Sequence, residues 1–208
     1  PLGFDLDRFK TDKDAKRAKF RQDYNLADNE IAIGIIGRLV PVKNHTLFLK
    51  ALKQVAEKTS KSIRAFIIGD GEERENINAL CQQLQLSIAE DNFADQKQLV
   101  TFTSWIKNVD YALAGLDLVC LSSLNEGTPV SLIEAQAANK PIVTTAVGGI
   151  KDVVIPDTTA LLSDSEDVEA FAGNLLRLVE DDKLRERMGT DGCEFVYDRY
   201  HYRRLASD

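Results

Sequence analysis

The chain has 208 residues, of which 44% are apolar, and its formal net charge is −7. That length suits one large domain or a domain with a tail, and the apolar share is ordinary for a globular core. The negative charge argues against a nucleic-acid-binding protein, because such proteins are usually basic.

Apolar runs typical of strands alternate with amphipathic runs typical of helices along most of the chain. Residues 1–12 resemble an extended connector in composition, and residues 85–98 are polar enough to predict a loop. In chain order, the expected elements are a helix at 13–24, a strand at 31–37, a helix at 44–58, a strand at 63–69, a helix at 73–84, a strand at 99–102, a helix at 108–114, a strand at 116–121, a helix at 129–138, strands at 141–145 and 159–162, and helices at 168–180 and 183–197.

Alternating strands and helices predict an α/β fold, with a doubly wound, mostly parallel Rossmann-like sheet and helices on both faces. We expect the domain to span residues 13–198, between the connector at 1–12 and a tail at 199–208. The sequence starts at Pro1, so we expect it to be part of a longer protein. Ligands of such sheets bind beyond the carboxyl ends of the strands.

Two glutamates eight positions apart, Glu126 and Glu134, flank a Gly-Thr-Pro turn between a strand and a helix. Thr128 is a good N-cap and Pro129 a good first helical residue, which puts Glu134 in the second helical turn. A helix N-terminus suits a phosphate, and two fixed acceptors beside it suit the hydroxyls of a ribose and a sugar. The motif therefore predicts a nucleotide-sugar site; the alternative is two ordinary surface acids.

A second group of charges follows the first expected strand. Gly37 allows a sharp turn, and Arg38 and Lys43 then project over the ligand edge of the sheet. A planar guanidinium and a compact ammonium both bind phosphate oxygens. The alternative is a pair of solvated surface cations.

Two glycine motifs also follow strands. Residues 69–71, Gly-Asp-Gly, resemble a dinucleotide-binding fingerprint, but Arg74 stands where its third glycine belongs, so we interpret them as a tight turn. Gly148 and Gly149 either allow a ligand to approach closely or form a plain turn.

No pattern with the spacing of metal ligands stands out. Asp5 and Asp7 lie in the connector, away from any strand end; of the histidines, we expect His45 to be solvated and His201 to be structural. The cysteines are far apart, which is typical of a reducing compartment. They are Cys81, Cys120 and Cys193. No metal and no cofactor are expected.

Four features in order resemble the C-terminal half of a retaining glycosyltransferase of the GT-B fold, in the group 1 (family 4) class. They are the connector at 1–9, the segment 37–39 with Lys43, the two-glutamate motif from Glu126 to Glu134, and the glycine turn at 147–149. The resemblance spans nearly the whole chain.

The resemblance implies a role for each residue. Arg38 and Lys43 bind the donor diphosphate and, with Glu126 on the donor sugar, form the expected catalytic set. Glu134 holds the ribose hydroxyls and Ile106 packs on the base. The implied donor-binding residues are Gly37, Ile106, Gly127, Thr128, Val130 and Glu134.

The implied reaction retains the anomeric configuration, needs no metal, and takes its sugar from a UDP- or GDP-sugar. The acceptor enters through an N-terminal domain, so this part alone is expected to be inactive. The expected location is the cytoplasm or the inner face of the membrane, with peripheral association through that missing half. The sequence departs from the family at Ser104, Asp152 and Asn44, where Gly, Glu and Gly are frequent.

Two other functions fit the same motifs. One is a sugar-nucleotide epimerase of related fold, whose catalytic carboxylates would lie in the missing half. The other is a non-catalytic module that binds a nucleotide. An epimerase would convert the donor without any acceptor, and a pure nucleotide binder would not depend on Glu126.

Overall fold

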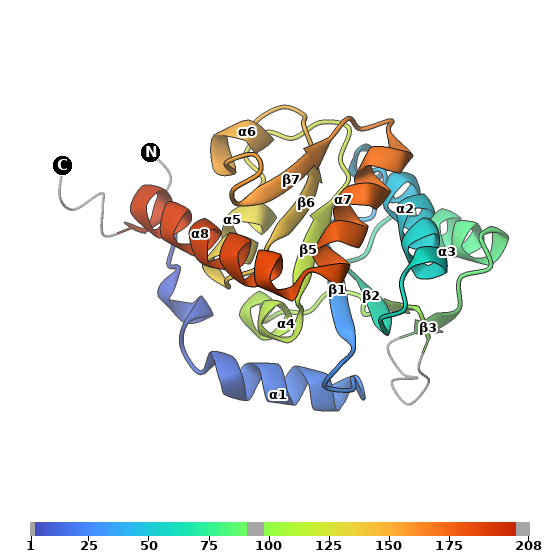
Figure 1. Cartoon of the computed structure of the whole chain (residues 1–208), viewed down its shortest axis with the longest axis horizontal. Helices are drawn as coiled ribbons and strands as arrows, with labels where there is room; N and C mark the ends of the chain where they lie inside the picture. The colour runs from blue at the N-terminus through green and yellow to red at the C-terminus, as the bar shows by residue number, and fades with distance from the viewer. Residues whose placement is uncertain (1–2, 91–97, 203–208) are drawn as a thin grey trace.

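A computed structural model describes residues 3–90 and 98–202. Within them, one sheet of seven strands has the order β3-β4-β2-β1-β5-β6-β7, and every adjacent pair is parallel (Figure 1). The predicted α/β fold class is confirmed. The strands are β1 Ile31–Ile36, β2 Ile63–Ile68, β3 Ile88–Glu90, β4 Val100–Phe102, β5 Leu118–Leu121, β6 Ile142–Thr145 and β7 Ala160–Ser163.

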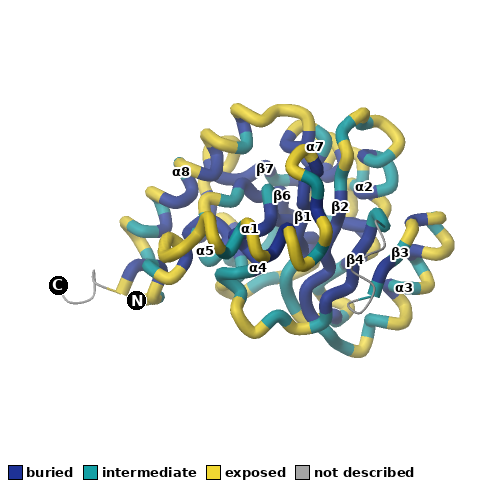
Figure 2. The backbone as a smooth tube through the Cα atoms, turned by 90° about the horizontal axis from the view of Figure 1, so that it is seen from below, coloured by how far each residue is buried: buried dark blue, intermediate teal, exposed yellow. Residues whose placement is uncertain are grey.

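Helices cover both faces of the sheet (Figures 1 and 2). On one face pack α2, α3 and α7, and on the other α1, α4, α5 and α6, while α8 contributes to the core of both. The α-helices are α1 Lys13–Asp23, α2 His45–Lys58, α3 Arg74–Gln83, α4 Val109–Gly115, α5 Val130–Ala137, α6 Ile150–Val153, α7 Val168–Glu180 and α8 Asp182–Tyr200. Two 3-10 helices are η1 Asp7–Phe9 and η2 Pro41–Lys43.

The strands are apolar on both sides because both sides are covered. In β1, Ile33 and Ile35 pack into the core beneath α2 and α7, whereas Ala32 packs into the core beneath α1 and α4. Successive side chains of a strand point to opposite faces, so two covered faces require a continuous apolar run. Figure 2 shows the central strands as the buried middle of the molecule.

The predicted loop at 85–98 is wrong in part. Ile88–Glu90 form the edge strand β3, which pairs with β4 in the register Ile88↔Val100. The segment around these residues is polar, so the strand does not stand out by composition, and it is held by hydrogen bonds to its neighbour. Residues 91–97 of that loop lie outside the described residues.

The sequence predicted an extended connector, but the structure shows that it is not simply extended. Leu6 and Phe9 are buried in the core, and the chain between them bends into η1. The Tyr197 hydroxyl donates to the Leu6 carbonyl at 2.5 Å, and the Phe4 amide donates to the Tyr200 carbonyl at 2.8 Å. Helix α8 therefore runs three residues past its predicted end, into the expected tail. The division into connector, domain and tail stays a prediction.

Candidate functional site

The chain reverses its direction across the sheet between β1 and β5, which are neighbours. From β1 the chain continues to β2 on one side, whereas β5, β6 and β7 follow one another on the other side. The loops that leave the carboxyl ends of β1 and β5 run apart at such a point, and ligands of open α/β sheets bind there. The charged residues after these two strands are the ones that the sequence singled out.

Lys43 and Glu126 meet at this point. The Nζ atom of Lys43 lies 2.5 Å from Oε1 of Glu126, and both side chains are largely shielded from solvent. The Ser123 hydroxyl donates to the same oxygen at 2.6 Å, and the Ser122 hydroxyl donates to the Lys43 carbonyl at 2.9 Å. The pair is therefore preformed: the Ser122 hydrogen bond joins the two loops, and the Ser123 hydrogen bond holds the Glu126 carboxylate within its own loop.

Arg38 has a different environment from Lys43. It is exposed, and in the described part of the chain its guanidinium makes no ion pair or hydrogen bond. A Cβ at Gly37 would lie 3.7 Å from Cε of Lys43, an ordinary contact, so the glycine leaves room beside the ammonium. Arg38 is free to take an anion, whereas Lys43 already has a carboxylate partner.

The predicted tight turn lies at the end of the Gly-Asp-Gly motif at 69–71, where the Arg74 amide donates to the Gly71 carbonyl at 3.1 Å across Glu72 and Glu73. The Gly71 amide donates to Oδ1 of Asp70 at 2.8 Å. A Cβ at Gly69 would collide with the Gly37 carbonyl oxygen at 1.9 Å, so this glycine lets the turn pack against the loop after β1. The turn supports the loop that carries Arg38.

Gly148 and Gly149 lie against the loop that carries Glu126. The Gly149 amide donates to the Glu126 carbonyl at 2.9 Å. A Cβ at Gly148 would lie 2.0 Å from that same carbonyl oxygen, and one at Gly149 would lie 1.9 Å from the Gly127 carbonyl oxygen. These glycines therefore allow a close approach of two backbone segments, and their packing fixes the position of the loop that carries Glu126.

The start of α5 differs from the prediction by one residue. Pro129 occupies the N-cap position, Val130 is the first helical residue, and no side chain caps the helix. Thr128 was expected to be the N-cap, but the Pro129 carbonyl accepts the first helical bond, from Leu132 at 3.0 Å, which leaves Thr128 outside the helix. A Cβ at Gly127 would meet nothing within 4 Å, so this turn borders open space.

Glu134 lies in the second turn of α5, as predicted, and faces the connector. Its Oε1 is 2.6 Å from Nη2 of Arg8 in η1, and a hollow of about 290 Å³ lies between Glu134 and the connector. Burial raises the pKa of Glu134, and the charge of Arg8 opposes that rise. No sequence pattern indicated Arg8, because the contact joins residues 126 positions apart.

The expected base contact, Ile106, is half-buried and packs against the core, whereas its neighbour Trp105 is 57% exposed. Ser104 has a left-handed backbone with φ of +51°, and Asn44 does likewise with φ of +47°. Both replace a glycine that is frequent in the family, and glycine adopts this conformation without strain. Trp105 is the large exposed aromatic at this edge that the sequence did not single out.

The two histidines are both buried. The prediction of a solvated His45 is wrong: it is 5% exposed at the start of α2, and burial, with the nearby charge of Lys43, lowers its pKa to about 4. It packs inward because it begins the buried face of an amphipathic helix. His201 is structural, as expected, with Nε2 3.1 Å from Oδ1 of Asp7 and its ring stacked on Tyr197.

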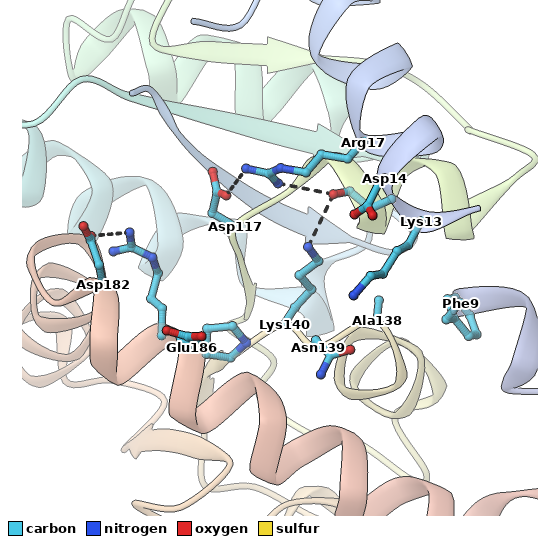
Figure 3. A pocket seen from close by; sticks show the side chains of 13 residues that line it. Phe9, Lys13, Asp14, Arg17, Asp117, Ala138, Asn139, Lys140, Asp182 and Glu186 are labelled. Atoms are coloured by element: carbon cyan, nitrogen blue, oxygen red, sulfur yellow. Dashed lines mark hydrogen bonds and ion pairs between the residues drawn. The ribbon is translucent and has the colours of Figure 1, made fainter. Parts of the chain in front are cut away.

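A second hollow, of about 330 Å³, lies between α1, α4 and α8 (Figure 3). Arg17 and Lys140 both donate to the Ala114 carbonyl in the last turn of α4, at 3.3 and 3.4 Å, and Arg17 also pairs with Asp117 at 2.7 Å. Burial lowers the pKa of Lys140 to about 8, with the charge of Arg17 acting in the same direction. Two cations thus meet the negative end of a helix dipole.

Residues 3–90 and 98–202 contain no group of three or more His, Cys, Asp and Glu side chains placed to hold a metal ion. Their helices include none with the length and apolar character needed to cross a membrane. All three cysteines are buried and free.

The parallel, doubly wound sheet places the chain in the Rossmann-like class of α/β proteins. Residues 16–194 match the family described as "Glycosyl transferases group 1". Because this match covers most of the chain, the chain belongs to the group 1 glycosyltransferase family, as its resemblance implied.

Curated relatives, including those named next, are between 22% and 29% identical to the chain over the aligned residues. It is 29% identical to the D-inositol 3-phosphate glycosyltransferase of Corynebacterium jeikeium, over 91% of this chain and 45% of the relative. It is 27% identical to the N-acetyl-alpha-D-glucosaminyl L-malate synthase of Bacillus anthracis, over 91% of this chain and 46% of the relative. The chain thus spans about half the length of the curated relatives that it matches.

Solved structures share the fold. Anabaena HepE in complex with UDP has a TM-score of 0.81 at 22% identity, covering 99% of this chain and 55% of HepE. The C-terminal domain of LpcC, a group 1 family protein from Francisella tularensis, has a TM-score of 0.77 at 21% identity, covering 96% of this chain and 99% of that domain. The chain therefore has the fold of that C-terminal domain.

Proposed function

We propose that this chain is the donor-binding half of a retaining glycosyltransferase, which transfers a sugar from a UDP- or GDP-sugar to an acceptor. The observation that carries the proposal is the Lys43–Glu126 pair at the reversal point between β1 and β5, 2.5 Å apart and tied to both loops. A charged pair at the ligand edge of such a sheet, in a group 1 family member, fits a donor with a diphosphate and a sugar. The solved HepE complex with UDP is consistent with a uridine nucleotide.

In this proposal the exposed Arg38 and the paired Lys43 bind the diphosphate and stabilise the nucleoside diphosphate as it leaves. Their role is electrostatic, since positive charges fixed near the leaving oxygens lower the energy of the transition state. Lys43 is held in place by Glu126 before the donor arrives, so it needs little reorganisation. These cations do the work of a divalent metal, and we propose that the reaction needs none.

Glu126 contacts the donor sugar in this proposal, and Glu134 accepts hydrogen bonds from the ribose hydroxyls. Lys43 and Ser123 both donate to Oε1 of Glu126, and no group of residues 3–90 or 98–202 donates to its Oε2, which leaves one oxygen for the sugar. In this proposal the half-buried Ile106, next to the exposed Trp105, packs on the base. The acceptor and the other wall of the cleft come from an N-terminal domain, so we propose that this half alone does not transfer sugar.

Calorimetric titration of the chain with UDP, GDP and ADP, in buffer containing EDTA, tests the proposal. We expect UDP or GDP to bind without metal and to bind more weakly as salt is added, because Arg38 is exposed. A joint change of Arg38 and Lys43 to methionine should abolish this binding, whereas Lys58→Met, an exposed lysine at the far end of α2, should not change it. Binding that appears only after magnesium or manganese is added contradicts the proposal, as does no binding at all.

A further inference from the structure

The connector brings a charge to Glu134 from the other end of the chain. Arg8 lies in η1, and its Nη2 atom is 2.6 Å from Oε1 of Glu134 on α5, 126 residues away. The Arg8 side chain is 45% exposed, whereas that of Glu134 is 18% exposed. The contact exists only while the connector is docked against α5.

The connector is held firmly in that position. Leu6 is fully buried and Phe9 nearly so, on either side of Arg8. The Tyr197 hydroxyl of α8 donates to the Leu6 carbonyl, and the guanidinium carbon of Arg8 lies 4.8 Å from the centre of the Phe9 ring. The buried side chains of Leu6 and Phe9 hold the connector in place, and the Phe9 ring also contacts the Arg8 guanidinium and fixes its direction.

We propose that Arg8 is a positioning residue for nucleoside recognition, which orients the carboxylate of Glu134 toward the ribose. The inference rests on the proposed function, in which Glu134 binds the ribose hydroxyls. Arg8 takes only Oε1, and no group in the described chain donates to Oε2. A hydroxyl can therefore donate to Oε2 while Arg8 stays in place.

The charges around Glu134 explain why it needs a cation. Burial raises the pKa of Glu134, and Asp110 of α4 raises it further, while Arg8 opposes both. Lys16 of α1 pairs with Asp110 at 2.9 Å, and Asp5 lines the hollow on the connector side. Without Arg8 the remaining influences favour the protonated carboxyl, which is a poorer acceptor for a ribose hydroxyl.

The test compares Arg8→Met with the conservative Arg8→Lys, by titration with UDP and GDP between pH 5 and pH 8. We expect Arg8→Met to weaken nucleotide binding about five- to tenfold at neutral pH, less than the loss of a direct hydrogen bond to a charged group, because Arg8 acts through Glu134. The loss relative to the unaltered chain should grow as the pH falls, and this ratio cancels the titration of the nucleotide itself. Arg8→Lys should restore most of the affinity, and Lys58→Met should change nothing.

A second readout needs no nucleotide. Carbon-detected NMR titration of the Glu134 carboxyl should show a higher pKa in Arg8→Met than in the unaltered chain, and an unchanged pKa overturns the inference. Nucleotide binding that is equal in both proteins at every pH also overturns it, and tighter binding by Arg8→Met shows that Arg8 competes with the ribose instead. If the unaltered chain binds no nucleoside diphosphate, the proposed function itself fails; if it binds and ignores Arg8, only this inference fails.

Discussion

At the scale of single residues, the position of Glu126 depends on the absence of a side chain at Gly148. This residue has a left-handed backbone with φ of +50°, and a Cβ there would lie 2.0 Å from the Glu126 carbonyl oxygen. Alanine at this position would be strained in its backbone and would also push the Glu126 loop away. The loop that carries Glu126 and the turn at Gly148 therefore fix each other's positions.

We expect Gly148→Ala to lower the free energy of unfolding by about 1–3 kcal/mol and to weaken nucleotide binding. Gly173→Ala is the matched control, because Gly173 is exposed in α7 and a Cβ there would meet nothing within 4 Å. That control should stabilise the chain by about 1 kcal/mol, since alanine favours a helix. Urea unfolding of both variants checks the pair, and equal effects would contradict the role given to Gly148.

At the scale of elements, the C-terminus of α4 gathers cations from two other segments. Arg17 of α1 and Lys140, just before β6, both donate to the Ala114 carbonyl (Figure 3). Arg17 is paired with Asp117, whereas the one hydrogen bond of the Lys140 side chain among residues 3–90 and 98–202 is long, at 3.4 Å. Burial of Lys140 therefore disfavours its charged form, and this cost is not offset by an ion pair of the kind that Arg17 makes.

The lowered pKa of Lys140 predicts how the free energy of unfolding depends on pH. The pKa of Lys140 falls from 10.5 to about 8 in the folded chain, so between those values the unfolded chain binds more protons. The contribution of Lys140 to the free energy of unfolding therefore rises with pH across this window. We expect the stability of Lys140→Met, relative to the unaltered chain, to fall between pH 8 and pH 10.5, as measured by urea unfolding.

The same series for Lys58→Met, which removes an exposed lysine, should show a difference that stays constant across that range. A constant difference for Lys140→Met as well would show that Lys140 keeps its ordinary pKa in the folded chain.

At the scale of the whole molecule, most of the fold follows from patterns that are local in the sequence. Six of the strands and the main helices are visible because their apolar or amphipathic runs stand out from the segments around them. Strand β3 is as long as β4, which was predicted, but it lies within a polar segment and therefore does not stand out. The burial of His45 was missed because local polarity says nothing about which face of α2 a residue takes.

The candidate site divides in the same way. The loops with Arg38, Lys43 and Glu126 follow strands that can be predicted, so their shared edge of the sheet could be predicted too. The Lys43–Glu126 and Arg8–Glu134 ion pairs could not, since each joins segments that only the folded sheet brings together. The residues' roles in binding a donor stay predictions.

The two glutamates of the motif have different partners, and this difference allows the most direct test of the proposed site. Glu126 is paired with Lys43 and assigned to the sugar, whereas Glu134 is paired with Arg8 and assigned to the ribose. The measurement is calorimetric titration of Glu126→Gln and Glu134→Gln with UDP and GDP, which carry the ribose but lack the donor sugar. We expect Glu134→Gln to weaken binding about tenfold or more, as for a lost hydrogen bond to a charged group. Glu126→Gln should leave it almost unchanged, because a glutamine amide oxygen can still accept from Lys43 and Ser123 and so keep the ammonium in place. Equal weakening in both variants would contradict the division of roles, and no change in either would contradict the site itself.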